Sequence, residues 1–180
     1  MKCTATLYLF LLVTVLGAGH CRKSLDNKGL PAATQEGKNT LGFMLNGQPW
    51  APKGFNGTAN LSVDFDAAFN NGIVGIVAYR TLSANDKTQF LLGITDSLNF
   101  KNAPFTLFIK KGSVGALGFS TKDYCDVLHT DTAIYENGKI NITKLDRLNH
   151  IISGTFEGVL YKAICGDTLK ITDGRFDIKY

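Results

Sequence analysis

Residues 152–180 read ISGTFEGVLYKAICGDTLKITDGRFDIKY, and this stretch decides the fold class. Apolar side chains return at every second position along much of it, which is the pattern of a β-strand with one buried face. The stretch also contains a near-repeat, because Gly154-Thr155-Phe156 and Gly174-Arg175-Phe176 lie twenty residues apart. We expect the two copies to form adjacent strands of one sheet, not a duplicated domain.

The second copy changes the face that carries its apolar residues. Leu169 and Ile171 occupy odd positions, whereas Phe176 and the apolar residues after it occupy even positions. Side chains of a strand alternate strictly, so the inward face can switch only where a bulge or a turn intervenes. The sequence predicts this irregularity at Asp173-Gly174.

Strand-like runs of β-branched and aromatic residues continue back to residue 41, separated by Asn-Gly, Asp-Gly and other glycine-rich turns. Asn46-Gly47 and Asn137-Gly138 each predict a two-residue hairpin turn. Residues 72–81 (GIVGIVAYRT) are apolar on both faces and predict a central strand, paired with residues 87–95.

Helical periodicity is weak throughout, and the only helical element expected is a short turn around residues 66–70. Residues 41–180 are therefore predicted to form a single all-β domain. Its architecture is expected to be an antiparallel β-sandwich or a closed meander barrel of about nine or ten strands.

The N-terminus predicts export. Lys2 precedes an apolar run at residues 7–16, which is too short to span a bilayer about 30 Å thick and is typical of a signal peptide, here residues 1–20. Cys21 follows the small residues Ala18 and Gly19, as in lipoproteins whose cysteine is acylated, although His20 stands where Gly, Ala or Ser is usual. The alternative is an ordinary cleavage near Ala18 or His20 that leaves Cys21 as a spare thiol.

Residues 21–40 contain few large apolar side chains and no sustained periodicity. This composition predicts a flexible tether between a lipid anchor at Cys21 and the domain, and it fits a frayed terminus equally well.

Four segments of the chain resemble a known family: NGQPW at residues 46–50, FNGTANLSVDFD at 55–66, IVAYR at 76–80, and the terminal stretch quoted above. They resemble a group of small secreted Bacteroidota proteins that is catalogued only as a domain of unknown function. The resemblance covers the chain from about Gly42 to its end, and the Gly-x-Phe element near the end is its most specific part. Members look like lipoproteins, which favours acylation of Cys21, and the family implies no activity and no catalytic residues.

The cysteines predict one disulfide. Cys3 lies in the predicted leader and Cys21 is the predicted anchor, which leaves Cys125 and Cys165 as a pair in an exported protein. The alternative is that both are unpaired and buried as small apolar side chains.

Composition and motifs give no sign of catalysis. The net charge is +4 without a clustered basic face, so nucleic acid is not an expected partner. His129 lies among carboxylates between Asp123 and Asp131, but the spacing matches no established metal site, and a surface loop is the simpler interpretation. Asp64 and Asp66 share the polar face of a predicted half-buried strand, where two solvated carboxylates are commoner than a catalytic pair. No metal or cofactor is expected.

Three functions remain, and the first is a binding module tethered to the cell envelope through the lipid on Cys21. It would lie at the outer membrane or cell surface, or in the periplasm without the lipid. Its ligand would be a glycan, a peptide or a protein. Trp50, Phe55 and Phe69 are candidate contacts if they are exposed, with core packing as the alternative for each.

The second function is a lipocalin-like barrel that carries a small apolar ligand, although Trp50 lacks the Gly-x-Trp context of that family. A large dry central cavity would favour it. An enzyme is the third, and it would require His129 and its neighbouring carboxylates to converge in a cleft.

Overall fold

A computed structural model describes residues 25–54, 57, 59–121, 126–128 and 134–180. Among these residues the secondary structure consists of β-strands and three short 3₁₀ turns, without an α-helix. The strands are β1 (Thr40–Leu45), β2 (Gln48–Trp50), β3 (Leu61–Asp66), β4 (Ile73–Thr81), β5 (Lys87–Ile94), β6 (Phe105–Ile109), β7 (Gly115–Thr121), β8 (Ile134–Asp146), β9 (Ile151–Lys162) and β10 (Thr168–Lys179). The 3₁₀ turns are η1 (Phe69–Asn71), η2 (Leu98–Phe100) and η3 (Ala163–Cys165). The all-β prediction is confirmed, and η1 overlaps the predicted turn.

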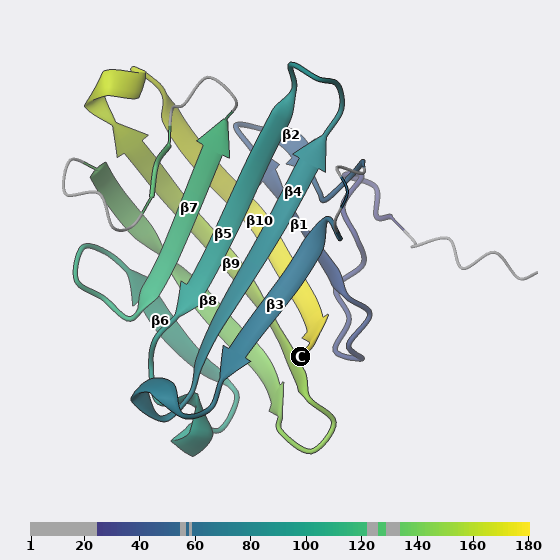
Figure 1. The fold of residues 1–180 in the computed structure, drawn as a ribbon, viewed down its shortest axis with the longest axis vertical. Helices are drawn as coiled ribbons and strands as arrows, with labels where there is room; N and C mark the ends of the chain where they lie inside the picture. Colours follow the sequence, from purple (N-terminus) through teal and green to yellow (C-terminus); the bar gives the residue numbers. More distant parts are fainter. Residues whose placement is uncertain (1–24, 55–56, 58, 122–125, 129–133) are drawn as a thin grey trace, which may run out of the picture.

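All ten strands belong to one mixed sheet with the order β2-β1-β10-β9-β8-β6-β7-β5-β4-β3. The sheet folds over so that two halves face each other (Figure 1). We call β3, β4, β5 and β7 the front half, and β1, β2, β6, β8, β9 and β10 the back half. The crease lies between β6 and β7, which share a single parallel bridge at Ile109 and Gly115.

The sheet is not closed into a barrel, so the closed-barrel alternative is wrong. A bridge between Lys53 and Arg80 of β4 joins the chain after β2 to the front half at one corner. The edge strands β2 and β3 do not pair with each other within the described part of the chain. A separate pair of antiparallel sheets is not formed either, because the halves are continuous through the crease.

Aromatic side chains fill the space between the halves. The ring centroids of Phe43 in β1 and Phe90 in β5 are 4.6 Å apart, and Phe90 stacks on Phe156 of β9 at 5.2 Å. Trp50 stacks on Phe43 at 4.8 Å, is only 2% exposed, and donates a hydrogen bond from Nε1 to Oγ1 of Thr88 at 2.9 Å. The hypothesis that Trp50 contacts a ligand at the surface is therefore wrong, because its ring is part of the core.

The Gly-x-Phe repeat pairs with itself. Strands β9 and β10 are antiparallel neighbours in which Gly174 lies opposite Phe156 and Phe176 lies opposite Gly154. A Cβ atom on Gly154 would lie 2.9 Å from Cζ of Phe176, and one on Gly174 would lie 2.6 Å from the ring of Phe156. Each phenylalanine ring thus covers the glycine of the other copy, and the prediction of adjacent strands is confirmed.

The predicted change of face in β10 is also confirmed. The register with β9 shifts between Ile171 and Gly174, and Asp173 adopts a positive φ of 54° at this point. Because of the extra residue, Ile171 and Phe176 both reach the core although one is odd-numbered and the other even-numbered.

Only one of the two predicted hairpins forms. Asn46-Gly47 connects β1 and β2 with φ values of 48° and 81°, as a two-residue turn requires. Asn137-Gly138 instead lies inside β8 and pairs with Val159 and Gly158 of β9. The turn after β8 comes at residues 147–150, which the carboxylate of Asp146 stabilises by accepting a hydrogen bond from the backbone N–H of Asn149 at 3.0 Å.

Residues 25–39, here called the N-terminal arm, pack against the sheet. Leu30 in the arm is fully buried, and Asp26 forms an ion pair with Arg175 of β10 at 2.8 Å. The predicted tether over residues 21–40 is corrected accordingly, since its described part is docked on β10. The physical reason is the acceptor Asp177, which the composition of the arm does not show.

Asp177 of β10 holds the arm through its carboxylate and is only 1% exposed. The carboxylate accepts hydrogen bonds from Thr34 Oγ1 at 2.6 Å, Ser153 Oγ at 2.7 Å, Gly37 N at 2.8 Å, Glu36 N at 3.1 Å and Lys38 N at 3.1 Å. Burial alone would raise the pKa of this carboxyl, but the hydrogen bonds outweigh burial and lower the pKa to about 2.

Candidate binding site on the outer sheet face

The candidate site lies on the outer face of β8, β9 and β10, in the back half of the sheet. Alternation directs every second side chain of these strands away from the core. Cross-strand pairing brings Tyr135 beside Tyr161, Asn137 beside Val159, and Lys139 beside Glu157. Pairing of β9 with β10 extends the second of these rows to Lys170.

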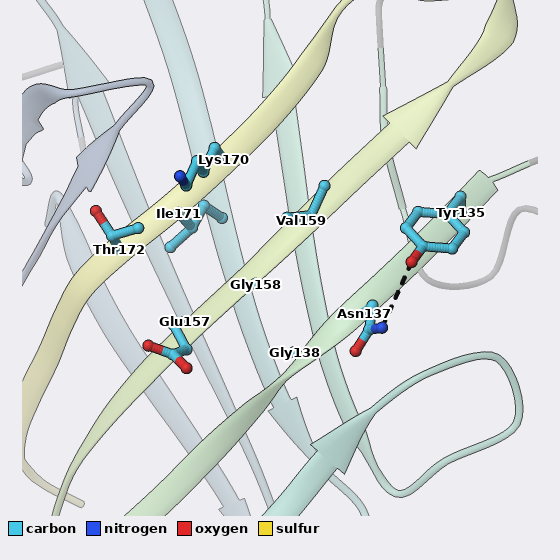
Figure 2. Close-up of a pocket in the computed structure, with 9 residues that line it drawn as sticks. All are labelled: Tyr135, Asn137, Gly138, Glu157, Gly158, Val159, Lys170, Ile171 and Thr172. Carbon is cyan, nitrogen blue, oxygen red and sulfur yellow. Dashed lines mark hydrogen bonds between the residues drawn. The ribbon is translucent and has the colours of Figure 1, made fainter.

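A hollow of about 400 Å³ opens on this face. Figure 2 shows that no side chain occupies its middle, where the backbones of Gly138 and Gly158 lie next to each other. A Cβ atom on Gly138 would lie 2.7 Å from the Cα atom of Gly158 and would overlap the carbonyl oxygen of Glu157. Glycine at position 138 is therefore required by the close approach of the two strands, not by a turn.

Two tyrosines lie at one end of the face. Tyr135 is 54% exposed and Tyr161 is 38% exposed, and they are direct cross-strand neighbours. The hydroxyl of Tyr135 accepts a hydrogen bond from Nδ2 of Asn137 at 3.4 Å, drawn as the dashed line in Figure 2. Exposed tyrosine rings offer apolar contact area at a low cost in side-chain entropy, together with a polar hydroxyl.

Polar groups surround the rest of the hollow. Glu157 forms an ion pair with Lys139 at 3.1 Å, and both side chains are about half exposed. An exposed ion pair of this kind contributes little to stability, so its groups remain available to a ligand. Lys170 and Thr172 approach from β10 on the opposite side of the hollow (Figure 2). The site can therefore donate and accept hydrogen bonds around an apolar surface.

The candidate contacts predicted from the sequence do not form this site. Trp50 is in the core, and Phe55 lies outside the described residues. Phe69 is 57% exposed in η1, between β3 and β4, and is not part of the face formed by β8–β10.

Several predicted residues lie outside the described part of the chain: Cys21, Asp123, Cys125, His129 and Asp131. Acylation of Cys21 and the pairing of Cys125 with Cys165 therefore stay predictions. Cys165 lies in η3, where it is half-buried against the core. Within the described residues, His, Cys, Asp and Glu side chains form no group of three or more that could hold a metal.

Asp66, one of the two β3 carboxylates singled out in the sequence, has a structural role. Asp64 and Asp66 are exposed on β3, and Oδ1 of Asp66 accepts hydrogen bonds from the backbone N–H groups of Ala68 and Phe69 at 2.8 and 3.1 Å. These bonds stabilise the turn that leads into η1.

Sequence patterns alone did not identify the pair of tyrosines on the outer face of β8–β10. Tyr135 and Tyr161 are 26 residues apart, and only the register of β8 with β9 makes them neighbours. Alternation in β9 could have placed Tyr161 on the outer face. It puts Glu157, Val159 and Tyr161 on the side of the strand opposite Phe156 and Leu160.

No helix in the described part of the chain has the length and the apolar character needed to cross a membrane. Comparisons of the chain with protein-family models, with curated proteins and with solved structures found no match. Function therefore has to be argued from the chemistry of the site.

Proposed function

We propose that this protein is an exported, non-catalytic β-domain that is anchored to the cell envelope through Cys21 and binds a glycan on the outer face of β8–β10. The observation that carries the proposal is the exposed pair Tyr135 and Tyr161 beside a hollow of about 400 Å³ with hydrogen-bonding groups around it.

The chemistry of this face matches that of a sugar ring. A pyranose has an apolar face of C–H groups, which an aromatic ring can cover, and an edge of hydroxyls that both donate and accept hydrogen bonds. Asn137 offers an amide, Glu157 a carboxylate and Lys170 an ammonium group around the hollow. Gly138 has no side chain, so a flat ligand can approach the backbone of the sheet closely at this position.

The filled core supports surface binding over the lipocalin-like alternative. A carrier of a small apolar ligand needs an internal cavity, whereas ring contacts between Phe43, Trp50 and Phe90 occupy the space between the two halves. A ligand would have to displace these rings and lose their packing energy.

The tyrosine pair provides the main test of glycan binding. Tyr135→Ala should lower the affinity for the tightest-binding glycan found on an array by at least about tenfold, because the truncation removes the exposed ring that covers the sugar face. Isothermal titration with that oligosaccharide measures the change.

Phe108→Ala is the matched control, since Phe108 is an exposed aromatic residue of the neighbouring strand β6 that does not line the hollow. This variant should bind normally. Equal losses in the two variants, or no binding of the wild-type protein to any glycan on the array, would contradict the proposal.

The anchor has its own test. In the wild-type protein expressed in a Bacteroidota host, intact mass should give a chain that begins at Cys21 and carries added acyl mass. Cys21→Ala should move the protein from the membrane fraction to the soluble fraction, because several acyl chains give stable attachment and their removal leaves none. An unmodified wild-type chain would restrict the proposal to a periplasmic glycan-binding protein.

A further inference from the structure

Strand β3 is the last strand of the front half, and its edge is regular. It pairs with β4 through six consecutive residues without a register shift, and it has no partner strand on its other side within the described residues. The opposite edge of the sheet differs, because β2 has only three residues and includes Pro49. A short strand and a proline are two means by which proteins block strand addition, and β3 has neither.

The pairing with β4 shows which backbone groups of β3 face outward. The carbonyl of Asn60 accepts a hydrogen bond from the N–H of Tyr79 at 2.8 Å, so this pair is hydrogen-bonded. Hydrogen-bonded pairs alternate along an antiparallel ladder, and the N–H and C=O groups of Leu61, Val63 and Phe65 therefore point away from β4. They form no backbone hydrogen bond to another described segment.

A second hollow lies beside the inward face of β3, with a volume of about 470 Å³. Val63 and Phe65 line it from β3, and His150 and Tyr180 line it from the back half, with Ala67, Asn99 and Arg147 completing the lining. The guanidinium group of Arg147 donates hydrogen bonds to the carbonyl oxygens of Leu98 and Lys101. The ring of Phe65 stacks on that of Tyr180 at 4.4 Å, and Tyr180 contacts His150 edge to face at 5.5 Å. The side chains of Val63 and Phe65 remain only half-buried, as expected where the sheet lacks a further strand to cover them.

Charge identifies the kind of segment that would add here. Asp64 and Asp66 are exposed on the outward face of β3, where a neighbouring strand would place its own outward side chains. A second β3 from another copy of this chain would bring four carboxylates together, whereas Lys or Arg would pair with them.

We propose that β3 is completed by an extended peptide segment of a partner protein in which apolar residues alternate with Lys or Arg. The apolar side chains cover Val63 and enter the hollow beside Phe65, the basic side chains lie next to Asp64, and the backbone pairs with Leu61, Val63 and Phe65. This site lies at the β3 edge and shares no residue with the proposed glycan face, so Tyr135→Ala leaves peptide binding unchanged.

The first test uses the acetylated and amidated peptide Lys-Val-Lys-Phe-Lys-Val-Lys and the full mature protein. Addition of the peptide should shift the backbone-amide NMR signals of Leu61, Val63 and Phe65 and produce a measurable affinity by titration calorimetry. Two N-methylated versions of the peptide, one methylated on the apolar residues and one on the lysines, separate strand pairing from charge attraction.

Antiparallel addition places the N–H groups of the apolar residues opposite β3, so methylation of these residues should weaken binding at least about tenfold while methylation of the lysines has little effect. The reverse pattern would indicate parallel addition to the same edge and would also support the proposal. Equal binding of both methylated peptides, or no binding of the parent peptide, would overturn it.

A pair of charge-matched variants tests the position of the site. Asp64→Lys should lower the affinity for the unmethylated peptide at least about tenfold, whereas Asp86→Lys, in the β4–β5 turn, should leave this affinity unchanged. Equal losses would show general charge attraction and overturn the proposal. A protein dimer that forms without peptide and is lost in Val63→Pro, which removes an outward N–H group of β3, would assign the edge to a second copy, which also overturns it.

Discussion

Replacement of Asp177 by asparagine is expected to lower the free energy of unfolding by about 3 kcal/mol. The carboxylate is nearly inaccessible and accepts five hydrogen bonds, two from hydroxyls and three from backbone N–H groups of the N-terminal arm. An amide in its place has one acceptor oxygen, and its NH₂ group must face donors. The N–H groups of the arm would lose their acceptor, and residues 25–39 should exchange their amide hydrogens faster.

Urea unfolding and hydrogen exchange measure this effect. Asp173→Asn is the matched control on the same strand, because Asp173 is exposed and forms only a surface ion pair with Lys28 at 2.9 Å. Loss of this ion pair should lower the free energy of unfolding by less than about 1 kcal/mol. Equal destabilisation by the two substitutions would contradict the role assigned to Asp177.

The same carboxyl makes stability depend on pH. Its folded pKa of about 2 is below the ordinary value of 3.8, so the ionised form stabilises the fold above pH 3.8. This contribution, about 2 kcal/mol, is lost as the pH falls from 3.8 through 2. Unfolding measured across this window should show a smaller pH dependence in Asp177→Asn than in the wild-type protein.

Trp50→Ala is expected to lower the free energy of unfolding by about 4 kcal/mol. The indole lies between the halves of the sheet, in ring contact with Phe43, Phe90 and Phe119, and its removal leaves a cavity that strands on both sides cannot fill. The hydroxyl of Thr88 also loses its donor.

Chemical denaturation of three variants tests the role of Trp50. Trp50→Phe should cost less than Trp50→Ala because it keeps an aromatic ring in the core. Phe69→Ala truncates an aromatic residue that is 57% exposed, and it should change stability by less than about 0.5 kcal/mol. A neutral Trp50→Ala would show that the indole does not hold the two halves together.

Local patterns predicted the strands and their irregularities because alternation and turn chemistry act over a few residues. The bulge at Asp173 and the hairpin at Asn46-Gly47 followed from such patterns. The second hairpin did not, because Asn-Gly also suits a strand whose neighbour approaches too closely for a Cβ atom, as Gly138 shows. The strand order could not be predicted, since β1 pairs with β10, at the other end of the chain.

The candidate site depended on long-range pairing in the same way. Tyr135 and Tyr161 had no pattern in common until β8 and β9 were aligned. For Trp50 the sequence left a surface contact and core packing open, and the structure shows core packing. Docking of the N-terminal arm was also hidden from local patterns, because the buried acceptor Asp177 lies about 140 residues from its hydrogen-bond donors in the arm.

With the proposed lipid on Cys21, the docked arm would also set the distance between the domain and a bilayer. Residues 22–24 separate Cys21 from Leu25, and the four Cα–Cα steps between these two residues span at most about 14 Å. Undocking of the arm would free residues 25–39 as well and extend the mean reach to about 23 Å. Under the proposed anchor, Asp177 would couple the docking of the arm to the distance between the membrane and the sheet.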